Sequence, residues 1–524
     1  MRYRSARCFG LFSASVALLL GLLTLSFREA EAQGVGPTMT HPQLALRTHA
    51  SGFVTPISMA FLGADDLLLL EKNSGKVLRI AGGDPAVTVL DLGVNFSSER
   101  GLLGIALHPK FPADPGVYLF WSCRSAAPPS DPFFPDEKEC SDATMFLADS
   151  GELLEAPLLG NRVDRFVWNG SALTYDHNLI KLRSFQNDGA QQPPGQEDEA
   201  QPPRGNHDGG VLRFGPDGKL YVLFGDVGRR GQLQNLPSGP TETGLGPVQP
   251  DDQFGGPEPD DAHFTGVILR LNDDGSTPTD NPFFAAGSAV GGEVGQNIQK
   301  IFAYGIRNSF GMAFDPRSGN LWYQENGEDA FDELNLAEPG MNSGWIQIIG
   351  PVARLSQYKG IETTSLHHED FPNLQQFRWG PERIADSPGE ALARLFKLPG
   401  SRYSDPEFSW KHVLAPAGIG FVRGRTLGPQ FEGDLFVGFS VPEPLGGPLF
   451  HFNLTGNRRK IAVDDPRLED RVADNLDFHD ITESESLVIG RDFGILTDIQ
   501  TGPNGNLFVV SLDQGAIYEI YRRR

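Results

Sequence analysis

The feature that most constrains the fold is a unit that recurs along the chain. Each copy runs from an apolar stretch through a turn, of the Pro-x-Gly type in the clearest copies, into an apolar strand. A repeat of this kind is typical of architectures in which each copy buries its apolar face against its neighbours. Three copies are clear and three are weaker: GGVLRFGPDGKLYVLFGD (209–226), GMAFDPRSGNLWYQENG (311–327) and TGPNGNLFVVSLDQGAIYEI (501–520), then 58–80, 104–122 and 420–440.

Each copy predicts a β-hairpin. Pro216 and Pro503 favour the backbone angle that begins a turn, and Gly218 and Gly505 allow its corner. The flanking residues are rich in Val, Leu, Phe and Tyr, which favour strands. With 62 Gly, 40 Pro and few convincing helical periodicities, the sequence predicts an all-β fold. Six units arranged in a ring predict a six-bladed β-propeller with long inserted loops, because closure leaves only short strand edges.

Two further expectations concern the ends of the ring and its loops. Residues 44–48 are expected to pair with the final strand near 517–521 and so close the ring. Three Pro-rich and acidic segments cannot bury a core, so we expect them to be surface loops. These segments are 124–142, 185–205 and 237–262.

The first 32 residues have the pattern of a secretory signal peptide. A basic start with Arg2, Arg4 and Arg7 leads into the apolar run 9–27, and a small-x-small site ends at Ala32. An uncleaved membrane anchor is the alternative, since the run is nearly long enough to span a bilayer. The pattern favours cleavage, which leaves a single propeller domain at 33–524 in the periplasm or outside the cell. No later segment is apolar enough for membrane insertion.

Export fits the cysteine content. Cys8 leaves with the signal peptide, so the mature chain keeps Cys123 and Cys140. A pair of cysteines in an oxidising compartment most simply forms one disulfide. The absence of a Cys-x-x-Cys motif gives no support to structural zinc or thioredoxin chemistry.

The charge is strongly acidic. The chain carries −23, and loss of the signal peptide removes a net +2, which leaves about −25. Such a surface repels phosphate backbones, so nucleic acid is not an expected partner.

Common catalytic signatures are absent: there is no Gly-x-Ser-x-Gly elbow, P-loop, His-Glu-x-x-His or dinucleotide-binding glycine motif. Four longer strings carry a specific resemblance instead. In chain order they are similar to the soluble quinoprotein glucose/sorbosone dehydrogenase family, and they extend over most of the mature chain. They are ERGLLGIALHPKF (99–111), NHDGGVLRFGPDGKLYVLFGD (206–226), GVILRLNDDGSTPTDNPF (266–283) and YGIRNSFGMAFDP…GMNSGW (304–345).

The resemblance implies a six-bladed propeller that oxidises aldose sugars with pyrroloquinoline quinone (PQQ) and calcium. It implies that His207 is the general base, a role that suits an imidazole at neutral pH. Taken alone, a single histidine is more often structural. Arg307 and Asn308 match the Arg-Asn pair that contacts the quinone, although an arginine that ties blades together by hydrogen bonds is a nearly equal alternative. Glu99 and Asn206 also match cofactor-site positions, and Asn206 replaces an acidic residue of glucose dehydrogenases.

The metal site implied by the resemblance is the loop Asn326-Gly327-Glu328. Its backbone carbonyls correspond to calcium ligands, with Gly327 and Glu328 as the metal-site residues; oxygen ligands suit this cation. Asp332 and Glu333 follow, and they could bind a second ion or simply hydrogen-bond the loop.

The sequence departs from the family where basic residues hold the carboxylates of the quinone. Ser440, Ile495 and Thr497 occupy these positions. A multiply charged anion that loses such contacts loses roughly 1.5–3 kcal/mol for each. Substitutes could come from elsewhere in the chain, and the candidates are Lys411, Arg423, Arg425 and Arg491.

The leading hypothesis is therefore an exported PQQ-dependent dehydrogenase that oxidises an aldose or related sugar hydroxyl, with the sugar and an electron acceptor as its partners. The first alternative is a non-catalytic propeller that binds a ligand but has lost the quinone. A weaker alternative is a calcium-dependent lactonase with Glu99, Asn206 and Asn308 as metal ligands. The sequence does not identify the sugar, the acceptor or the oligomeric state.

Overall fold

In a computed structural model, the strands of the described residues form six sheets. The structure describes residues 36–124, 140–142, 145–146, 149–151, 157, 159–184, 206–227, 265–364, 384–441 and 446–523. The predicted signal peptide lies outside these residues, as do most of 124–142 and all of 185–205 and 237–262.

Sheets 1 to 3 follow one another along the chain. Sheet 1 has the order β3 (Pro56–Gly63), β4 (Asp66–Glu71), β5 (Lys76–Ala81) and β6 (Val87–Asp91). Sheet 2 contains β7 (Leu102–Leu107), β8 (Gly116–Ser122), β9 (Asn161–Trp168) and β10 (Leu173–Leu182). Sheet 3 has the order β11 (Val211–Phe214), β12 (Leu220–Phe224), β13 (Val267–Leu271), β14 (Ile301–Tyr304), β18 (Met341–Asn342) and β19 (Arg402–Tyr403).

Sheets 4 to 6 complete the set. Sheet 4 contains β15 (Met312–Phe314), β16 (Leu321–Glu325), β17 (Ala330–Ala337), β20 (Phe408–His412) and β25 (Val472–Ala473). Sheet 5 contains β21 (Pro416–Phe421), β22 (Leu435–Phe439), β23 (Leu449–Leu454), β26 (Val488–Arg491) and β1 (Thr38–Met39), with β24 (Ile461–Ala462) paired to β23. Sheet 6 has the order β27 (Leu496–Thr501), β28 (Leu507–Ser511), β29 (Ala516–Arg522) and β2 (Leu44–Ser51).

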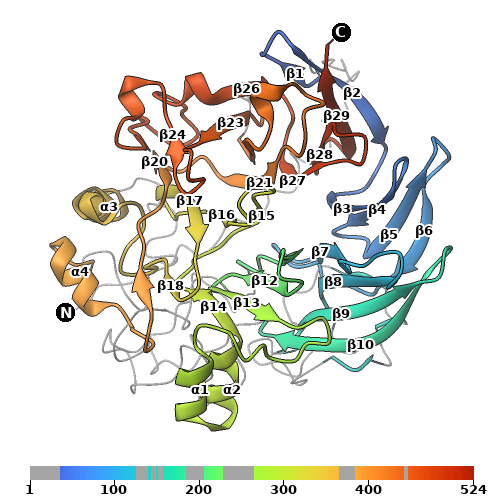
Figure 1. Ribbon diagram of the computed structural model, residues 1–524, viewed down its shortest axis with the longest axis horizontal. Helices are drawn as coiled ribbons and strands as arrows, with labels where there is room; N and C mark the ends of the chain where they lie inside the picture. The colour runs from blue at the N-terminus through green and yellow to red at the C-terminus, as the bar shows by residue number, and fades with distance from the viewer. Residues whose placement is uncertain are drawn as a thin grey trace, which may run out of the picture. The chain divides into compact units, whose positions relative to one another are not determined.

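The six sheets form a closed ring. The first strand of each sheet contacts the first strand of the next, in the order β3, β7, β11, β15, β21 and β27, and β27 contacts β3 again. In Figure 1 the labels of β3, β7, β15, β21 and β27 lie around the middle of the picture. This arrangement confirms the prediction of an all-β propeller.

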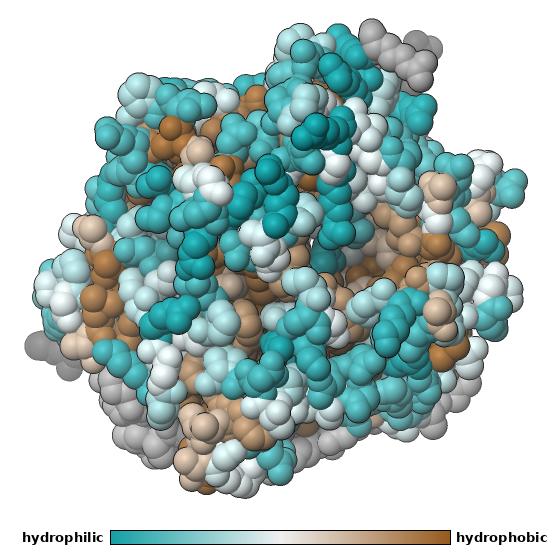
Figure 2. Space-filling view, viewed as in Figure 1, coloured by the Kyte–Doolittle hydropathy of each residue, from teal (hydrophilic) through white to brown (hydrophobic). Residues whose placement is uncertain are grey.

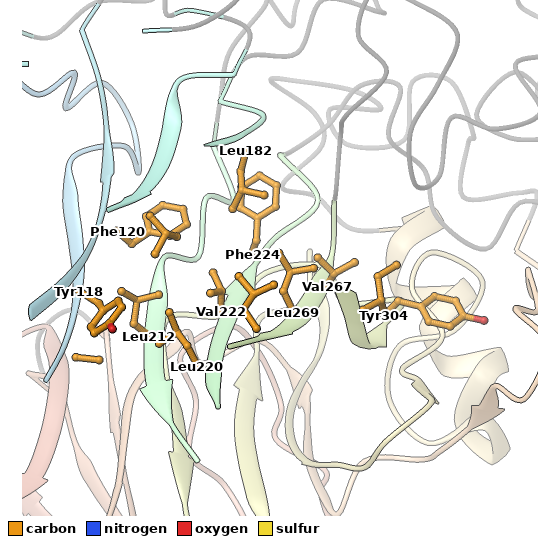
Figure 3. Packing of buried hydrophobic residues seen from close by; sticks show 14 of the residues in the cluster. Tyr118, Phe120, Leu182, Leu212, Leu220, Val222, Phe224, Val267, Leu269 and Tyr304 are labelled. Carbon is orange, nitrogen blue, oxygen red and sulfur yellow. The ribbon is translucent and has the colours of Figure 1, made fainter. Parts of the chain in front are cut away.

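Six buried clusters each lie between two neighbouring sheets, and a seventh packs Phe331 and Trp345 with residues of α3 and α4, whose bounds are given below. Strand β8 shows the reason, because successive side chains of a strand point to opposite faces. Val117, Leu119 and Trp121 pack toward sheet 1, whereas Tyr118 and Phe120 pack toward sheet 3. Figure 3 shows this second cluster, with the side chains of β8 facing those of β11 and β12. Strands buried on both faces explain why the recurring units are apolar throughout rather than alternating.

The predicted hairpins and ring closure are confirmed. The turn between β11 and β12 contains Gly218 at φ +72°, a left-handed conformation that glycine adopts without strain. Strand β2 pairs antiparallel with β29, and the pairing aligns Leu44 with Arg522 and Thr48 with Tyr518. The chain therefore joins its first long strand to its last.

The predicted disulfide is also confirmed. Cys123 and Cys140 are bonded, and their Cα atoms lie 6.4 Å apart. The bond joins Cys123, directly after β8, to Cys140, which follows the residues 125–139 outside the described part of the chain.

Helices are few and lie between strands of sheets 3 and 4. They are α1 (Phe284–Val290), α2 (Gly292–Lys300), α3 (Leu355–Thr364) and α4 (Pro388–Arg394). The described residues also include short 3-10 turns at Val352–Arg354, Pro429–Phe431, Pro466–Leu468 and Glu485–Leu487. Among the described residues, no helix is long and apolar enough to cross a membrane. Figure 2 shows a largely hydrophilic face that is hollowed near its middle, where hydrophobic residues are visible.

Candidate active site

A cavity of about 280 Å³ lies at the ends of the innermost strands. Its walls come from all six sheets or the loops that lead into them, and they include Ile57, Gly104, Val211, Phe310, Ala417 and Thr497. Glu99 and Asn326, two residues from the segments singled out in the sequence, also line it. Pockets for small molecules occupy roughly 300–1,000 Å³, so this cavity is near the lower end of that range.

His207 lies directly behind the wall of the cavity that contains Glu99. The backbone N–H of His207 donates to Oε2 of Glu99 at 2.7 Å. The backbone of His207 has φ +59°, an uncommon conformation for a residue other than glycine. Such strain costs of the order of 1–3 kcal/mol and persists only where surrounding contacts fix it. The side chain of His207 is buried, with 5% of its surface exposed.

Asp226 orients the His207 ring. Nδ1 of His207 lies 2.6 Å from Oδ1 of Asp226. A carboxylate only accepts hydrogen bonds, so this contact puts the ring proton on Nδ1 and leaves Nε2 as the basic nitrogen. The indole N–H of Trp345 donates to the other oxygen of Asp226 at 2.7 Å. His207, Asp226 and Trp345 thus form a relay that fixes both the tautomer and the ring plane.

Arg307 is buried behind the same relay. Its guanidinium lies 5.6 Å from the centre of the Trp345 ring, and it donates to the carbonyl oxygen of Asn326 at 2.8 Å and to Glu328 at 2.5 Å. Burial alone lowers the pKa of Arg307, but the carboxylates of Glu328 and Asp226 raise it overall. The arginine therefore stays charged and ties the loop after β16 to the relay.

Glu99 joins two of the predicted residues. Its Oε2 accepts from the backbone of His207 and, at 3.0 Å, from Nδ2 of Asn308. The other amide atom, Oδ1 of Asn308, is buried and has no hydrogen-bond partner among the described residues. Oδ1 of Asn326 is likewise buried and has no hydrogen-bond partner among the described residues. Because buried polar atoms are normally satisfied, the unpaired oxygen of Asn326 in the wall of the cavity indicates a site for a ligand that donates a hydrogen bond.

Asp208 lies next to His207 and is fully buried. Its Oδ1 accepts from Nδ2 of Asn161 at 2.7 Å. Burial raises the pKa of Asp208 to about 6, against the opposing attraction of Arg100. This residue ties the loop of His207 to sheet 2.

Asp332 and Glu333 accept hydrogen bonds from the loops around them. This is one of the two alternatives that the sequence left open for these residues. Oδ1 of Asp332 accepts from the backbone of Gly327 at 2.9 Å, and its Oδ2 accepts from Leu414 and Ala415. Burial raises the pKa of Asp332 to about 6, although these backbone donors act in the opposite direction. Glu333 accepts from the backbone of Gly350.

The predicted residues do not all meet. Glu99, His207, Arg307 and Asn308 form one connected group with the loop 326–328. Asn206 makes no side-chain hydrogen bond within the described part of the chain, and Asp226 rather than Asn206 contacts the imidazole. Sequence reasoning missed Asp226 and Trp345. The available signal was their place at the ends of two of the four strings, and Asp226 also follows the apolar run 220–224.

The structure also places the positions that depart from the family pattern. Ser440, Ile495 and Thr497 line the cavity, so they are indeed wall residues of the candidate site. The proposed substitutes Lys411, Arg423, Arg425 and Arg491 are not among the residues that line it. Arg423 lines a second cavity, and Arg425 pairs with Glu432.

Comparison with known proteins bears on this geometry. A family model described as Glucose / Sorbosone dehydrogenase matches residues 53–131 and 195–375. The chain belongs to the glucose/sorbosone dehydrogenase family. The matched residues include Glu99, His207, Asp226 and Arg307, which carry the hydrogen-bonded group described above.

Two curated relatives of this glucose/sorbosone dehydrogenase family member are named as dehydrogenases. The aldose sugar dehydrogenase YliI of Escherichia coli is 27% identical over 307 residues, which cover 59% of this chain and 57% of that protein. The quinoprotein glucose dehydrogenase B of Acinetobacter calcoaceticus is 29% identical over 291 residues, which cover 55% of this chain and 49% of that protein. The matches therefore extend over about half the length of these two relatives.

Solved structures support the fold of this glucose/sorbosone dehydrogenase family member. A putative glucose dehydrogenase from Thermus thermophilus has a TM-score of 0.54 at 23% identity, with 91% of this chain and 99% of that chain covered. The PQQ-bound aldose sugar dehydrogenase from Streptomyces coelicolor has a TM-score of 0.52 at 21% identity, with 92% and 98% covered.

Proposed function

We propose that this protein is an exported dehydrogenase that oxidises a CH–OH group of an aldose or a related sugar, with PQQ as its cofactor. Its place in a family of sugar dehydrogenases supports an oxidoreductase. In this proposal each of the six sheets is one blade, residues 1–32 are a cleaved signal peptide, and the protein works in the periplasm or outside the cell.

The observation that carries the proposal is the 2.6 Å contact between His207 and Asp226 behind the wall of the cavity. A base for alcohol oxidation must accept the hydroxyl proton while the adjacent carbon loses hydride. With Nδ1 committed to Asp226, Nε2 is the atom of His207 that accepts this proton. The negative charge of Asp226 then stabilises the imidazolium that forms, as a buried carboxylate does for a catalytic histidine elsewhere.

PQQ would supply the acceptor for the hydride that leaves the sugar carbon. Two buried polar atoms in the cavity have no hydrogen-bond partner among the described residues: the hydroxyl of Thr497 can donate to an oxygen of the quinone, and Oδ1 of Asn326 can accept from a ring N–H. Asn326 and Thr497 are the residues that would hold it, whereas the carboxylate of Glu99 would repel its acidic groups. One of the relatives is a quinoprotein glucose dehydrogenase, and this similarity supports the same cofactor.

Calcium fits less well at the loop 326–328. The carbonyl oxygen of Asn326 accepts from Arg307, and the carboxylate of Glu328 is in an ion pair with the same guanidinium. A cation at either oxygen would meet the positive charge of Arg307. Among the described residues, no group of three His, Cys, Asp or Glu is placed to hold a metal. Gly327 and Glu328 as metal-site residues stay a prediction, and we derive no step from calcium.

Reconstitution of the purified mature protein tests this proposal. Quinone absorbance and dye reduction would be followed across a panel of aldoses, with and without added calcium, for the wild type and for His207→Ala. We expect quinone binding by both proteins and turnover only by the wild type. Lack of binding at micromolar quinone would refute the proposal.

That negative outcome would favour the second candidate, a propeller that binds a ligand without catalysis. The specific observation in its favour is the uncharged wall formed by Ser440, Ile495 and Thr497. The lactonase alternative has less support. Asn308 presents its N–H₂ rather than its oxygen to Glu99, and Asn206 does not reach either residue by a hydrogen bond within the described residues.

A further inference from the structure

A second cavity lies on the axis of the ring, at the other ends of the six innermost strands. Residues at or just before the starts of these strands supply most of the wall of the candidate active site, whereas later residues of the same strands line the second cavity. Its volume is about 340 Å³, which lies within the range of small-molecule pockets. The strand residues in its wall are 59–61, 105–107, 212–214, 313–314, 420–421 and 499–501, and Arg423 follows the fifth strand. The ring therefore has a cavity at each end of its axis.

A hydrogen-bonded partition lies between the two cavities. Arg213 lines both of them, and its guanidinium donates to Oδ1 of Asp498 at 2.9 Å. The other oxygen of Asp498 accepts from the hydroxyl of Ser58, the backbone N–H of Met59 and Nε2 of Gln500. Asp498 itself is in the wall of the candidate active site and not in that of the second cavity. These contacts join β3, β11 and β27 across the axis, so the two cavities are separate sites.

The wall of the second cavity is largely aromatic. Four different sheets each contribute one phenylalanine to it: Phe61, Phe214, Phe314 and Phe421. The ring of Phe214 is held edge-on by Tyr118, with the ring centroids 5.0 Å apart. The ring of Phe314 is held in the same way by Tyr221, at 5.1 Å. Rings fixed in this way offer a rigid apolar surface, which suits a ligand with a ring or another compact apolar body.

The charge in the wall of the second cavity is positive. Among the described residues that line it, the titratable ones are Arg213 and Arg423, and there is no carboxylate. Asp498 offsets the charge of Arg213 from within the partition. The side chain of Arg423 forms no ion pair or hydrogen bond within the described residues, and its backbone N–H donates to Oγ1 of Thr501 at 3.0 Å. One guanidinium charge in the wall is therefore not offset, in a chain that carries −23 overall.

We propose that the second cavity binds a small carboxylate with an aromatic or alicyclic body. The apolar body lies against the phenylalanine rings, and the carboxylate accepts hydrogen bonds from Arg423, since a planar guanidinium matches the geometry of a carboxylate. A single charge that is not offset favours a monoanion over a polyanion, because the acidic chain repels further negative charge. This site is separate from the proposed quinone chemistry and requires neither the cofactor nor turnover.

The test is a titration of the full mature protein, without quinone, with 4-fluorobenzoate, followed by fluorine NMR. Two further probes separate the ring from the charge: 4-fluorobenzyl alcohol has the ring without the charge, and trifluoroacetate has the charge without the ring. We expect saturable binding of 4-fluorobenzoate and an affinity for the alcohol that is about 3- to 10-fold lower. Trifluoroacetate should show no saturable binding over the same concentrations.

Variants of the wall test the two contacts one at a time. Arg423→Gln should weaken the binding of 4-fluorobenzoate about 3- to 10-fold, as expected for an exposed charge, and leave the alcohol unchanged. Phe314→Leu should weaken both probes alike, because it removes a ring from the wall and keeps the charge. The matched control is Arg425→Gln, on the same loop but outside the cavity wall and in an ion pair with Glu432. It should bind both probes as the wild type does.

Each outcome decides for or against the second site. No saturable binding of 4-fluorobenzoate by the wild type overturns it, as do equal losses in Arg423→Gln and Arg425→Gln, which would come from net charge. Ser440→Phe narrows the candidate active site, so loss of binding in this variant would put the ligand there and also overturn the proposal. Unchanged binding in Ser440→Phe and Arg425→Gln, with the loss in Arg423→Gln, supports it. Thermal midpoints within a few degrees of the wild type show that the variants are folded, and if Phe314→Leu fails this control, the exposed position Arg423 decides alone.

Discussion

Replacing Asp208 by Asn should make the protein more stable at neutral pH. Asp208 is fully buried, and only one of its oxygens, the one that accepts from Asn161, has a hydrogen-bond partner among the described residues. Burial raises the pKa of Asp208 from 3.8 to about 6. Asparagine has the shape of the protonated acid and can still accept from Asn161 through its amide oxygen. The variant therefore keeps the contact and removes the charge that burial disfavours.

The sign and size follow from proton linkage. A carboxyl group whose pKa is higher in the folded protein contributes stability that is present at low pH and lost as the pH rises through about 6. Each unit of the shift corresponds to about 1.4 kcal/mol. The Asp208→Asn variant should therefore exceed the wild type in the free energy of unfolding by about 1 kcal/mol at pH 4.5 and by about 3 kcal/mol at pH 7.5.

The assay is urea unfolding of both proteins at these two pH values, followed by tryptophan fluorescence. The matched control is Asp84→Asn, at an exposed position, which should change the free energy of unfolding by less than about 0.5 kcal/mol. Two results would refute the reasoning. One is a variant less stable than the wild type at pH 7.5, which would mean that attraction to Arg100 outweighs the cost of burial. The other is a difference that does not change with pH.

Three further outcomes test the site and the scaffold. Asp226→Asn presents an N–H to His207 and reverses the tautomer, so kcat should fall about 10²- to 10⁴-fold. The equivalent change at Asp434, which pairs with a histidine in sheet 5, should leave kcat unchanged; equal losses would contradict the role of Asp226. Trp345→Phe removes the donor to Asp226 and should lower the free energy of unfolding by about 1–3 kcal/mol; urea midpoints equal to those of the wild type would argue against this. Replacing Cys123 and Cys140 by Ser should lower the free energy of unfolding by about 3 kcal/mol, since the bond closes a loop across 17 residues of sequence separation. The reduced wild type should unfold at the same urea concentration as this variant, and no loss in either would show that the bond adds nothing.

The scaffold was predictable from the sequence because its signals are local. A turn such as the one at Gly218 is encoded within five residues, and the apolar runs on either side show that both faces of the strand are buried. The same local pattern, repeated six times, was enough to predict a ring. Closure could be predicted because a ring of sheets brings the first and last parts of the chain together, as the pairing of β2 with β29 does.

The site was harder because its contacts join distant parts of the chain. His207 and Arg307 could be singled out by resemblance, but the partner of His207 could not. Asp226 is 19 residues away and Trp345 is 119 residues from Asp226, and only the ring brings them together.

The pairing of β2 with β29 also has a consequence for the order in which the molecule can be assembled. Sheet 6 needs residues 44–51 and residues 516–522 at once. A ribosome makes the first of these strands long before the last, so β2 waits as an unpaired strand throughout synthesis. Contacts of such long sequence separation form slowly. A chain still lacking β29 therefore has an open ring, and the propeller can close only after its last strand has been made.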